Sequence, residues 1–177
     1  MQHRWLRDRH SSILGGVDPD PQPSIGRDTA GVIAPPPLVY LGGLAAGFAL
    51  RSALPPTPVP PAVRWPVGGA LLALGGTLMG SFVRSFARAG TPVSPYSAST
   101  ALVTTGPYRI SRNPGYLGMA LVYAGIGVTS EALWALAPLP AVLVVIDRGV
   151  IAREEQYLTR RLGDEYRRYK QRTRRWL

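Results

Sequence analysis

Residues 100–116 read Thr-Ala-Leu-Val-Thr-Thr-Gly-Pro-Tyr-Arg-Ile-Ser-Arg-Asn-Pro-Gly-Tyr, and apolar stretches flank this segment on both sides. Its Gly-Pro and Asn-Pro pairs are turn signals. Between them lie Tyr108, Arg109 and Arg112, whose side chains can stack, donate hydrogen bonds and hold anions. A rigid polar segment between two membrane segments indicates a site that lines a cavity at the membrane surface. A basic loop that only fixes topology explains the same spacing, so both interpretations stay open here.

Composition favours a membrane protein of one domain. The chain has 177 residues, of which 46% are apolar and 17% charged, and its net charge is +10. Two arginines are the only charged residues between positions 35 and 83, and one glutamate is the only one between 113 and 146. Ten of the twenty basic residues lie from Arg148 onward. Such segregation of charge is typical of membrane proteins.

The residue types exclude several kinds of site. No cysteine is present, which excludes disulfides and thiolate metal ligands. The two histidines, His3 and His10, lie in the polar N-terminus, so we expect neither a histidine metal site nor a catalytic histidine. A basic chain can bind nucleic acid. Here the positive charge flanks apolar spans, so the bilayer is the expected partner and nucleic acid is not.

The hydropathy pattern predicts an all-α integral membrane protein with about four transmembrane helices. Residues 1–34 are polar and rich in Pro, Asp and Arg, and we expect them to be disordered and cytoplasmic. A membrane domain follows from 35 to 177. Its predicted spans are about 38–54, 66–83, 114–130 and 133–152. Small residues along the second span, five glycines among them, favour close helix packing over ligand contact.

Two prolines and a glutamate define the ends of these spans. Pro66 opens the second span, in the first-turn position where proline is tolerated. A single helix over 116–146 would be roughly 46 Å long, too long for one crossing of a core about 30 Å thick. A hairpin that turns near Ser130-Glu131 is therefore expected. Glu131 is then a solvated turn residue, with a buried proton carrier as the alternative.

Arginine-rich segments precede the first span, link the second to the third and follow the fourth. The positive-inside rule therefore places both termini and residues 100–116 in the cytoplasm. The expected location is a bacterial cell membrane. Residues 84–112 form a long connection, which we expect to be an ordered loop.

Residues 153–173 predict a cytoplasmic amphipathic helix that Gly163 breaks, with Asp164 capping the helical turns after the break. Glu154 and Glu155 flank its apolar stripe. As a basic helix on anionic lipid, it would use both glutamates in ordinary surface pairs. In the functional interpretation, at least one carboxylate packs against residues 100–116. The helical periodicity is compatible with both the lipid-surface helix and the functional interpretation.

Two motifs resemble those of a known family. Residues 102–118, Leu-Val-Thr-Thr-Gly-Pro-Tyr-Arg-Ile-Ser-Arg-Asn-Pro-Gly-Tyr-Leu-Gly, are similar to the signature of small integral-membrane methyltransferases. These include isoprenylcysteine carboxyl methyltransferases and phosphatidylethanolamine N-methyltransferases. Glu154-Glu155, followed by Leu-Gly-Asp-Glu-Tyr at 162–166 and then Tyr169, is similar to the second half of that signature. The resemblance covers roughly residues 76–177.

The resemblance implies S-adenosylmethionine as cofactor and a membrane lipid or lipophilic molecule as acceptor. For this reaction either Arg109 or Arg112 can hold the cofactor carboxylate or a lipid phosphate, and we expect Arg112 to be the catalytic one. If the acceptor is an ammonium, Glu155 is the candidate base that removes its proton. The implied cofactor contacts are Thr100, Ala101, Leu102, Val103, Tyr108, Asn113, Pro114, Gly115, Tyr116 and Glu154.

Two positions depart from the carboxyl methyltransferases. Those enzymes carry Arg-His-Pro where this chain has Arg-Asn-Pro, and Asn113 is what the phosphatidylethanolamine enzymes tend to show. They also place an arginine one turn before the paired glutamates, where this chain has Val150. An amine or hydroxyl acceptor therefore becomes more plausible than a carboxylate. An integral-membrane NADPH-dependent reductase and a non-enzymatic membrane adaptor of the same fold are the alternatives.

Overall fold

The computed structural model describes residues 30–90 and 102–177, and over these ranges the chain is helical, with no named strand. Thr100 and Ala101, two of the predicted cofactor contacts, lie outside the described residues, as does most of the N-terminal segment that is predicted to be disordered. The helical elements are α1 (Pro36–Ala53), α2 (Pro61–Ala89), the 3-10 turn η2 (Gly106–Arg109), α3 (Pro114–Thr129), the 3-10 turn η3 (Leu133–Leu136), α4 (Leu139–Val145), the π-helical η4 (Ile146–Ile151), α5 (Ala152–Leu162) and α6 (Asp164–Arg172).

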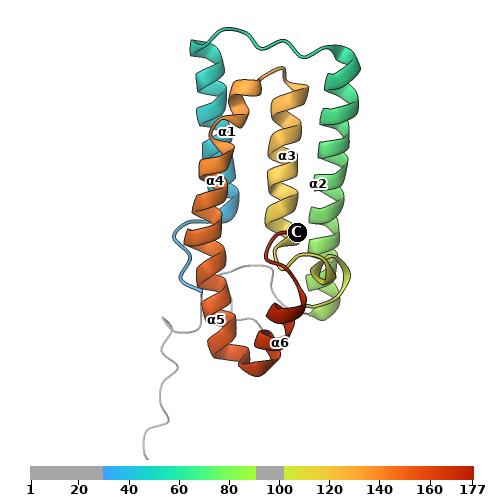
Figure 1. Cartoon of the computed structure of the whole chain (residues 1–177), viewed down its shortest axis with the longest axis vertical. Helices are drawn as coiled ribbons and strands as arrows, with labels where there is room; N and C mark the ends of the chain where they lie inside the picture. The colour runs from blue at the N-terminus through green and yellow to red at the C-terminus, as the bar shows by residue number, and fades with distance from the viewer. Residues whose placement is uncertain (1–29, 91–101) are drawn as a thin grey trace, which may run out of the picture.

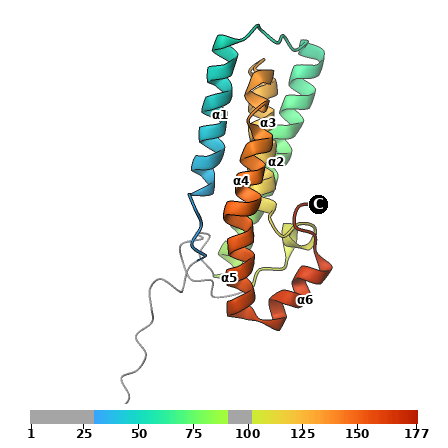
Figure 2. The ribbon, with the colours of Figure 1, turned by 60° about the vertical axis from the view of Figure 1, so that its left-hand side comes forward.

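Helices α1, α2, α3 and α4 run side by side along the long axis of the molecule (Figures 1 and 2). Helix α4 continues through η4 into α5 without a break in helical backbone. After α5 the chain reverses into α6 at one end of the bundle, and the C-terminus returns to the adjacent end of α3 (Figure 1). The segment that precedes α3 lies at this same end, so the two halves of the sequence motif meet there.

Glycines let α2 and α3 pack along their length. A Cβ on Gly75 would lie 2.7 Å from the carbonyl oxygen of Gly118, and one on Gly68 would lie 2.5 Å from the Thr129 side chain. Both approaches are too close for a larger side chain. The prediction of close packing is therefore confirmed at Gly68 and Gly75. It is wrong for the three other glycines of α2, which face open space: Gly69, Gly76 and Gly80.

The core lies where α1, α3 and the α4–η4 helix meet. Its buried members are Tyr40, Tyr123, Val142, Ile146, Val150 and Ile151. The Tyr123 hydroxyl donates a 2.7 Å hydrogen bond to the carbonyl of Ala135 in η3. Because a buried hydroxyl must find a partner, this bond fixes the hairpin that joins α3 to α4.

The hairpin turns at Ser130 and Glu131, as predicted. Glu131 has a φ of 50°, a left-handed conformation that few non-glycine residues adopt. Its carboxylate pairs with Arg64 of α2, and its side chain is 37% exposed. Glu131 is thus a turn residue, as predicted, but its carboxylate is ion-paired as well as exposed to solvent. The sequence analysis missed the pair because its partners lie 67 positions apart.

Three helix ends differ from the sequence-based predictions: the two ends of α2 and the start of α6. Helix α2 begins at Pro61, so Pro66 lies inside it, where it removes the backbone hydrogen bond to the carbonyl of Ala62 and crowds that carbonyl. The same helix continues to Ala89, where Gly90 ends it in a left-handed conformation. The first part of the predicted 84–112 loop is therefore helix. Asp164 does not cap α6, because Gly163 occupies the cap position and no side chain supplies a cap bond.

Among residues 30–90 and 102–177, two helices are long and apolar enough to cross a membrane: α2, and the helical stretch Leu133–Leu162. Helix α3 is apolar but shorter, at 16 residues. In the second stretch the apolar part ends at Ile146, and Asp147 and Arg148 are the first of the charged residues that follow. We treat the membrane-spanning segment as ending there, with the paired glutamates beyond it. The fold is thus all-helical and compatible with a membrane.

Candidate functional site

The segment before α3 folds against the end of α2. Gly106 starts the η2 turn with a φ of +61°, which glycine adopts without strain. The turn places the Tyr108 ring against α2, with its centroid 6.4 Å from that of Phe82 and 5.9 Å from that of Phe86. The Tyr169 hydroxyl of α6 donates a 2.7 Å hydrogen bond to the carbonyl of Tyr108. The two motif halves are therefore in direct contact.

Glu154 lies where α5 meets α3. Its carboxylate accepts a 2.7 Å hydrogen bond from the Tyr116 hydroxyl, and the Tyr116 carbonyl accepts a 2.9 Å bond from Tyr40 of α1. Burial raises the pKa of Glu154 to about 7, although the Tyr116 hydrogen bond works in the opposite direction. In residues 30–90 and 102–177, no cationic side chain pairs with this carboxylate. It is therefore a partly buried carboxyl group that no cation of the described residues neutralises.

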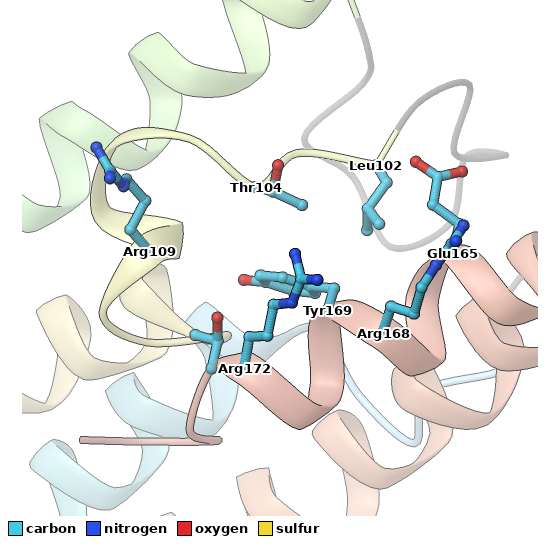
Figure 3. A pocket seen from close by; sticks show the side chains of 8 residues that line it. Leu102, Thr104, Arg109, Glu165, Arg168, Tyr169 and Arg172 are labelled. Atoms are coloured by element: carbon cyan, nitrogen blue, oxygen red, sulfur yellow. The ribbon is translucent and has the colours of Figure 1, made fainter.

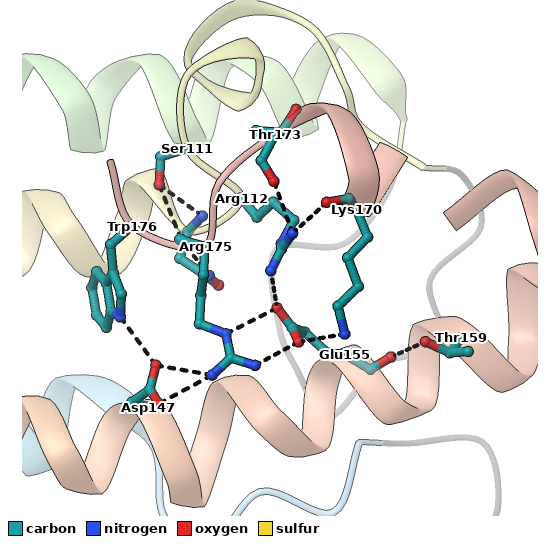
Figure 4. A network of polar contacts seen from close by, with 10 residues as sticks. Ser111, Arg112, Asp147, Glu155, Thr159, Lys170, Thr173, Arg175 and Trp176 are labelled. Atoms are coloured by element: carbon teal, nitrogen blue, oxygen red, sulfur yellow. Dashed lines mark hydrogen bonds and ion pairs between the residues drawn. The ribbon is translucent and has the colours of Figure 1, made fainter. Parts of the chain in front are cut away.

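Glu155, the next residue, has the opposite environment (Figure 4). Its carboxylate contacts Arg112 at 2.9 Å, Arg175 at 2.8 Å and Lys170 at 3.1 Å. Burial favours the neutral form, but the hydrogen bonds from Arg175 and Lys170 and the charge of Arg112 outweigh it, so the pKa of Glu155 is lowered. Glu155 thus stays ionised and closely paired. Such a carboxylate is a weak proton acceptor.

The last residues of the chain are bound to the segment before α3. The Arg112 amide donates to the Arg174 carbonyl at 2.9 Å, and the Asn113 side-chain amide donates to the Arg175 carbonyl at 2.9 Å. The Arg175 guanidinium also bridges to Asp147 at 3.1 Å, and the Trp176 indole donates to Asp147 at 3.0 Å. We call this set, Glu155, Arg112, Asp147, Arg175 and Trp176, the C-terminal clamp (Figure 4).

The sequence analysis did not single out Asp147, Arg175 or Trp176. A signal was available for Asp147, because a lone carboxylate at the end of an apolar span is uncommon and usually paired. Nothing in the periodicity marks the two C-terminal residues. They lie beyond α6, and their role depends on how the chain returns to α3.

The predicted site residues fall into three groups. Tyr108, Tyr116 and Glu154 gather on one side of the α3–α5 contact, within range of mutual electrostatic influence. Arg112, Asn113 and Glu155 belong to the C-terminal clamp or bond to it. The remainder pack or border the loop: Val103 and Pro114 are buried, Gly115 lies against Phe82 of α2, and Leu102 is partly buried. Among the described residues, no group of three or more metal-ligating side chains is present.

Comparison with known proteins gives a family for this arrangement. The phospholipid methyltransferase profile matches residues 63–165, which is more than half of the chain and includes both motif halves up to Glu165. The chain belongs to the phospholipid methyltransferase family. Membership indicates a methyltransferase that acts on a lipid, and it confirms the family resemblance.

One curated relative covers only part of the chain. A stretch of 35 residues is 63% identical to an uncharacterized protein of Haemophilus influenzae (strain ATCC 51907 / DSM 11121 / KW20 / Rd). The match covers 20% of this chain and 56% of that protein. The chain therefore spans just over half the length of this relative. No solved structure matches the chain.

Proposed function

We propose that this protein transfers a methyl group from S-adenosylmethionine to a lipid or lipid-linked acceptor at the cytoplasmic face of a membrane. Family membership supports the reaction class. The observation that carries the proposal is the Glu154 carboxylate, partly buried beside Tyr116 and lacking a cationic partner in the described part of the chain. This group lies at the contact between the two motif halves.

The Glu154 carboxylate and the Tyr116 hydroxyl are groups suited to the proposed cofactor. S-adenosylmethionine carries two cationic groups, a sulfonium and an ammonium, and when bound it supplies a methyl group that is already activated for transfer. A carboxylate in a poorly solvated position stabilises a cation far more than one in water. Glu154 would hold one of these cations, with the Tyr116 hydroxyl fixing the orientation of its carboxylate. The chain then needs mainly to position the acceptor in line with the methyl group.

The other predicted cofactor contacts have supporting but separate roles. The Tyr108 ring, on the same side as Glu154, would pack on the adenine or hydrogen-bond the ribose. Leu102, Val103, Asn113, Pro114 and Gly115 would shape the wall of the site, and Thr100 and Ala101 are proposed contacts from the family resemblance alone.

For Arg112 and Glu155 we propose a positioning role. Their 2.9 Å ion pair joins the segment before α3 to α5, next to Glu154 and Tyr116. Glu155 is the expected base for an ammonium acceptor, but its lowered pKa makes proton removal from that acceptor unfavourable. The pair instead holds the loop and helix at the spacing that the site requires.

The proposed membrane arrangement has four spans with both termini in the cytoplasm of a bacterial cell. It rests on the two candidate spans, on the apolar α1 and α3 beside them, and on the arginine-rich segments at the end where α5 and α6 lie. The lipid would enter sideways between helices, and the soluble cofactor would enter from the cytoplasm.

Methyl-labelled S-adenosylmethionine tests the function. The full chain is placed in lipid nanodiscs with a total bacterial lipid extract, and the lipid products are separated. The expected result is label in a lipid that disappears with Glu154→Gln but persists with Asp164→Asn, which alters a carboxylate of α6 whose side chain is 83% exposed. The mobility of the labelled lipid then names the acceptor class. Absence of both label and saturable binding of S-adenosylhomocysteine would contradict the proposal.

A further inference from the structure

A groove lies on the side of α6 that faces the loop before η2 (Figure 3). Its cavity volume is about 590 Å³. Four residues of α6, spaced so that they share one helix face, form one wall, and the opposite wall comes from the segment before η2 and from η2 itself. The lining residues are Leu102, Thr104, Arg109, Glu165, Arg168, Tyr169, Arg172 and Thr173.

The groove is cationic. It presents three guanidinium groups, from Arg109, Arg168 and Arg172, against one carboxylate, from Glu165. Within residues 30–90 and 102–177, none of these three arginine side chains has an ion pair or a hydrogen bond. Other arginines nearby are paired, such as Arg112 and Arg175 in the C-terminal clamp. Guanidinium groups available around a cavity favour a ligand with phosphate oxygens, which they bind in bidentate fashion.

The groove adjoins the proposed cofactor site, because Leu102 borders both. Neither Glu154 nor Tyr116 lines it. Tyr169 lies at the boundary, since its side chain lines the groove while its hydroxyl bonds to the Tyr108 carbonyl. The groove also lies at the end of the bundle where the apolar part of the long helix has ended, a level at which phospholipid headgroups are found.

We propose that this groove binds the phosphodiester headgroup of an anionic phospholipid that is not the methyl acceptor. The bound lipid anchors α6 and the segment before η2 to the membrane surface. A cavity of this size accommodates a headgroup, and three guanidinium groups, unpaired among the described residues, supply the charge to hold it. This site goes beyond the proposed function and does not depend on it.

The test titrates dihexanoyl phosphatidylglycerol into the purified full chain in detergent, measured by calorimetry. This short-chain lipid forms no bilayer, so non-specific attraction of the basic protein to a charged membrane surface does not contribute to the measured binding. Arg168→Gln/Arg172→Gln should weaken binding by about twenty-fivefold, because each basic residue near a lipid headgroup contributes about fivefold. The matched control, Arg88→Gln/Arg160→Gln, removes the same charge from two exposed positions outside the groove and should change affinity less than about twofold.

A gain-of-binding variant keeps the proposal testable if the double variant folds poorly. Glu165→Gln removes the carboxylate that lines the groove and should tighten lipid binding by about threefold. Equal losses in the groove and control variants, or no loss in either, would overturn the proposal. So would inorganic phosphate binding as tightly as the lipid, because the ligand would then be a soluble anion. A matching loss of S-adenosylmethionine binding in the groove variant would place the groove in the cofactor site instead.

Discussion

Cofactor binding should depend on pH through Glu154. Burial raises the pKa of this carboxyl group to about 7, so its ionised fraction falls from about 90% at pH 8 to about 10% at pH 6. If only the carboxylate holds the cofactor cation, the apparent affinity for S-adenosylmethionine should fall about tenfold over this interval. The measurement is equilibrium binding in detergent without acceptor lipid, so that no methyl transfer occurs.

The stability of the ligand-free protein should change in the opposite direction. The pKa of Glu154 is higher in the folded protein, about 7, than its ordinary value of 4.5, so the folded state binds the proton more tightly. The resulting contribution to stability is fully present below pH 4.5 and is lost as the pH rises through about 7. Lowering the pH from 8 to 6 therefore increases the contribution of Glu154 to the free energy of unfolding. Thermal unfolding at each pH separates weaker binding from loss of fold, because acid unfolding would lower both quantities together.

Glu154→Gln is the control for this prediction. Glutamine keeps the size and the acceptor oxygen for Tyr116 but does not titrate. Its affinity should be low and should vary less than about twofold between pH 6 and 8. The two proteins differ at position 154 alone, so the profile of the variant serves as the baseline for every other group. A tenfold fall that persists in Glu154→Gln, or a flat profile in the unmodified protein, would refute the reasoning.

Two further changes test the packing and the clamp. Gly75→Ala places a Cβ 2.7 Å from a backbone carbonyl of α3 and should destabilise the protein by about 1–3 kcal/mol in thermal or denaturant unfolding. The control, Gly76→Ala, faces open space and should not destabilise the protein. Equal effects of the two substitutions would contradict the packing account. Arg175→Ala removes the bidentate partner of Glu155, so it should lower the free energy of unfolding by about 1–2 kcal/mol and expose the C-terminus to carboxypeptidase. The control, Arg174→Ala, removes an exposed side chain and should have neither effect. Resistance to carboxypeptidase in both variants would argue against the clamp.

The sequence predicted the helical class and placed the two motif halves on the same membrane face. The prediction of the helical class rests on the segregated charge and the apolar runs. A long apolar helix can be recognised from its own residues, without knowledge of contacts with distant parts of the sequence. The hairpin at Ser130 was predictable from length alone. The contact of Glu154 with residues 100–116 was one of two open interpretations, and the hydrogen bond to Tyr116 supports the functional one.

Other features required the three-dimensional arrangement. Glu154 and Glu155 are adjacent in sequence, yet one lacks a cation in the described structure and the other has three, because they project about 100° apart around α5. Periodicity gives that angle but not which groups lie on each side. The C-terminal clamp depends on the reversal at Gly163, and the Arg64–Glu131 pair depends on the packing of α2 on α3. Such long-range pairs leave no local pattern.

Photolabelling with S-adenosylmethionine tests the central claim, that a cofactor binds against Glu154, most directly. The full chain is irradiated with methyl-labelled cofactor, digested and mapped by mass spectrometry, with Glu154→Gln treated in parallel. Label is expected in peptides that contain Tyr108, Tyr116 or residues 154–157, and it should be lost in the variant. Label confined to residues 165–173, or equal labelling of the variant, would contradict the claim.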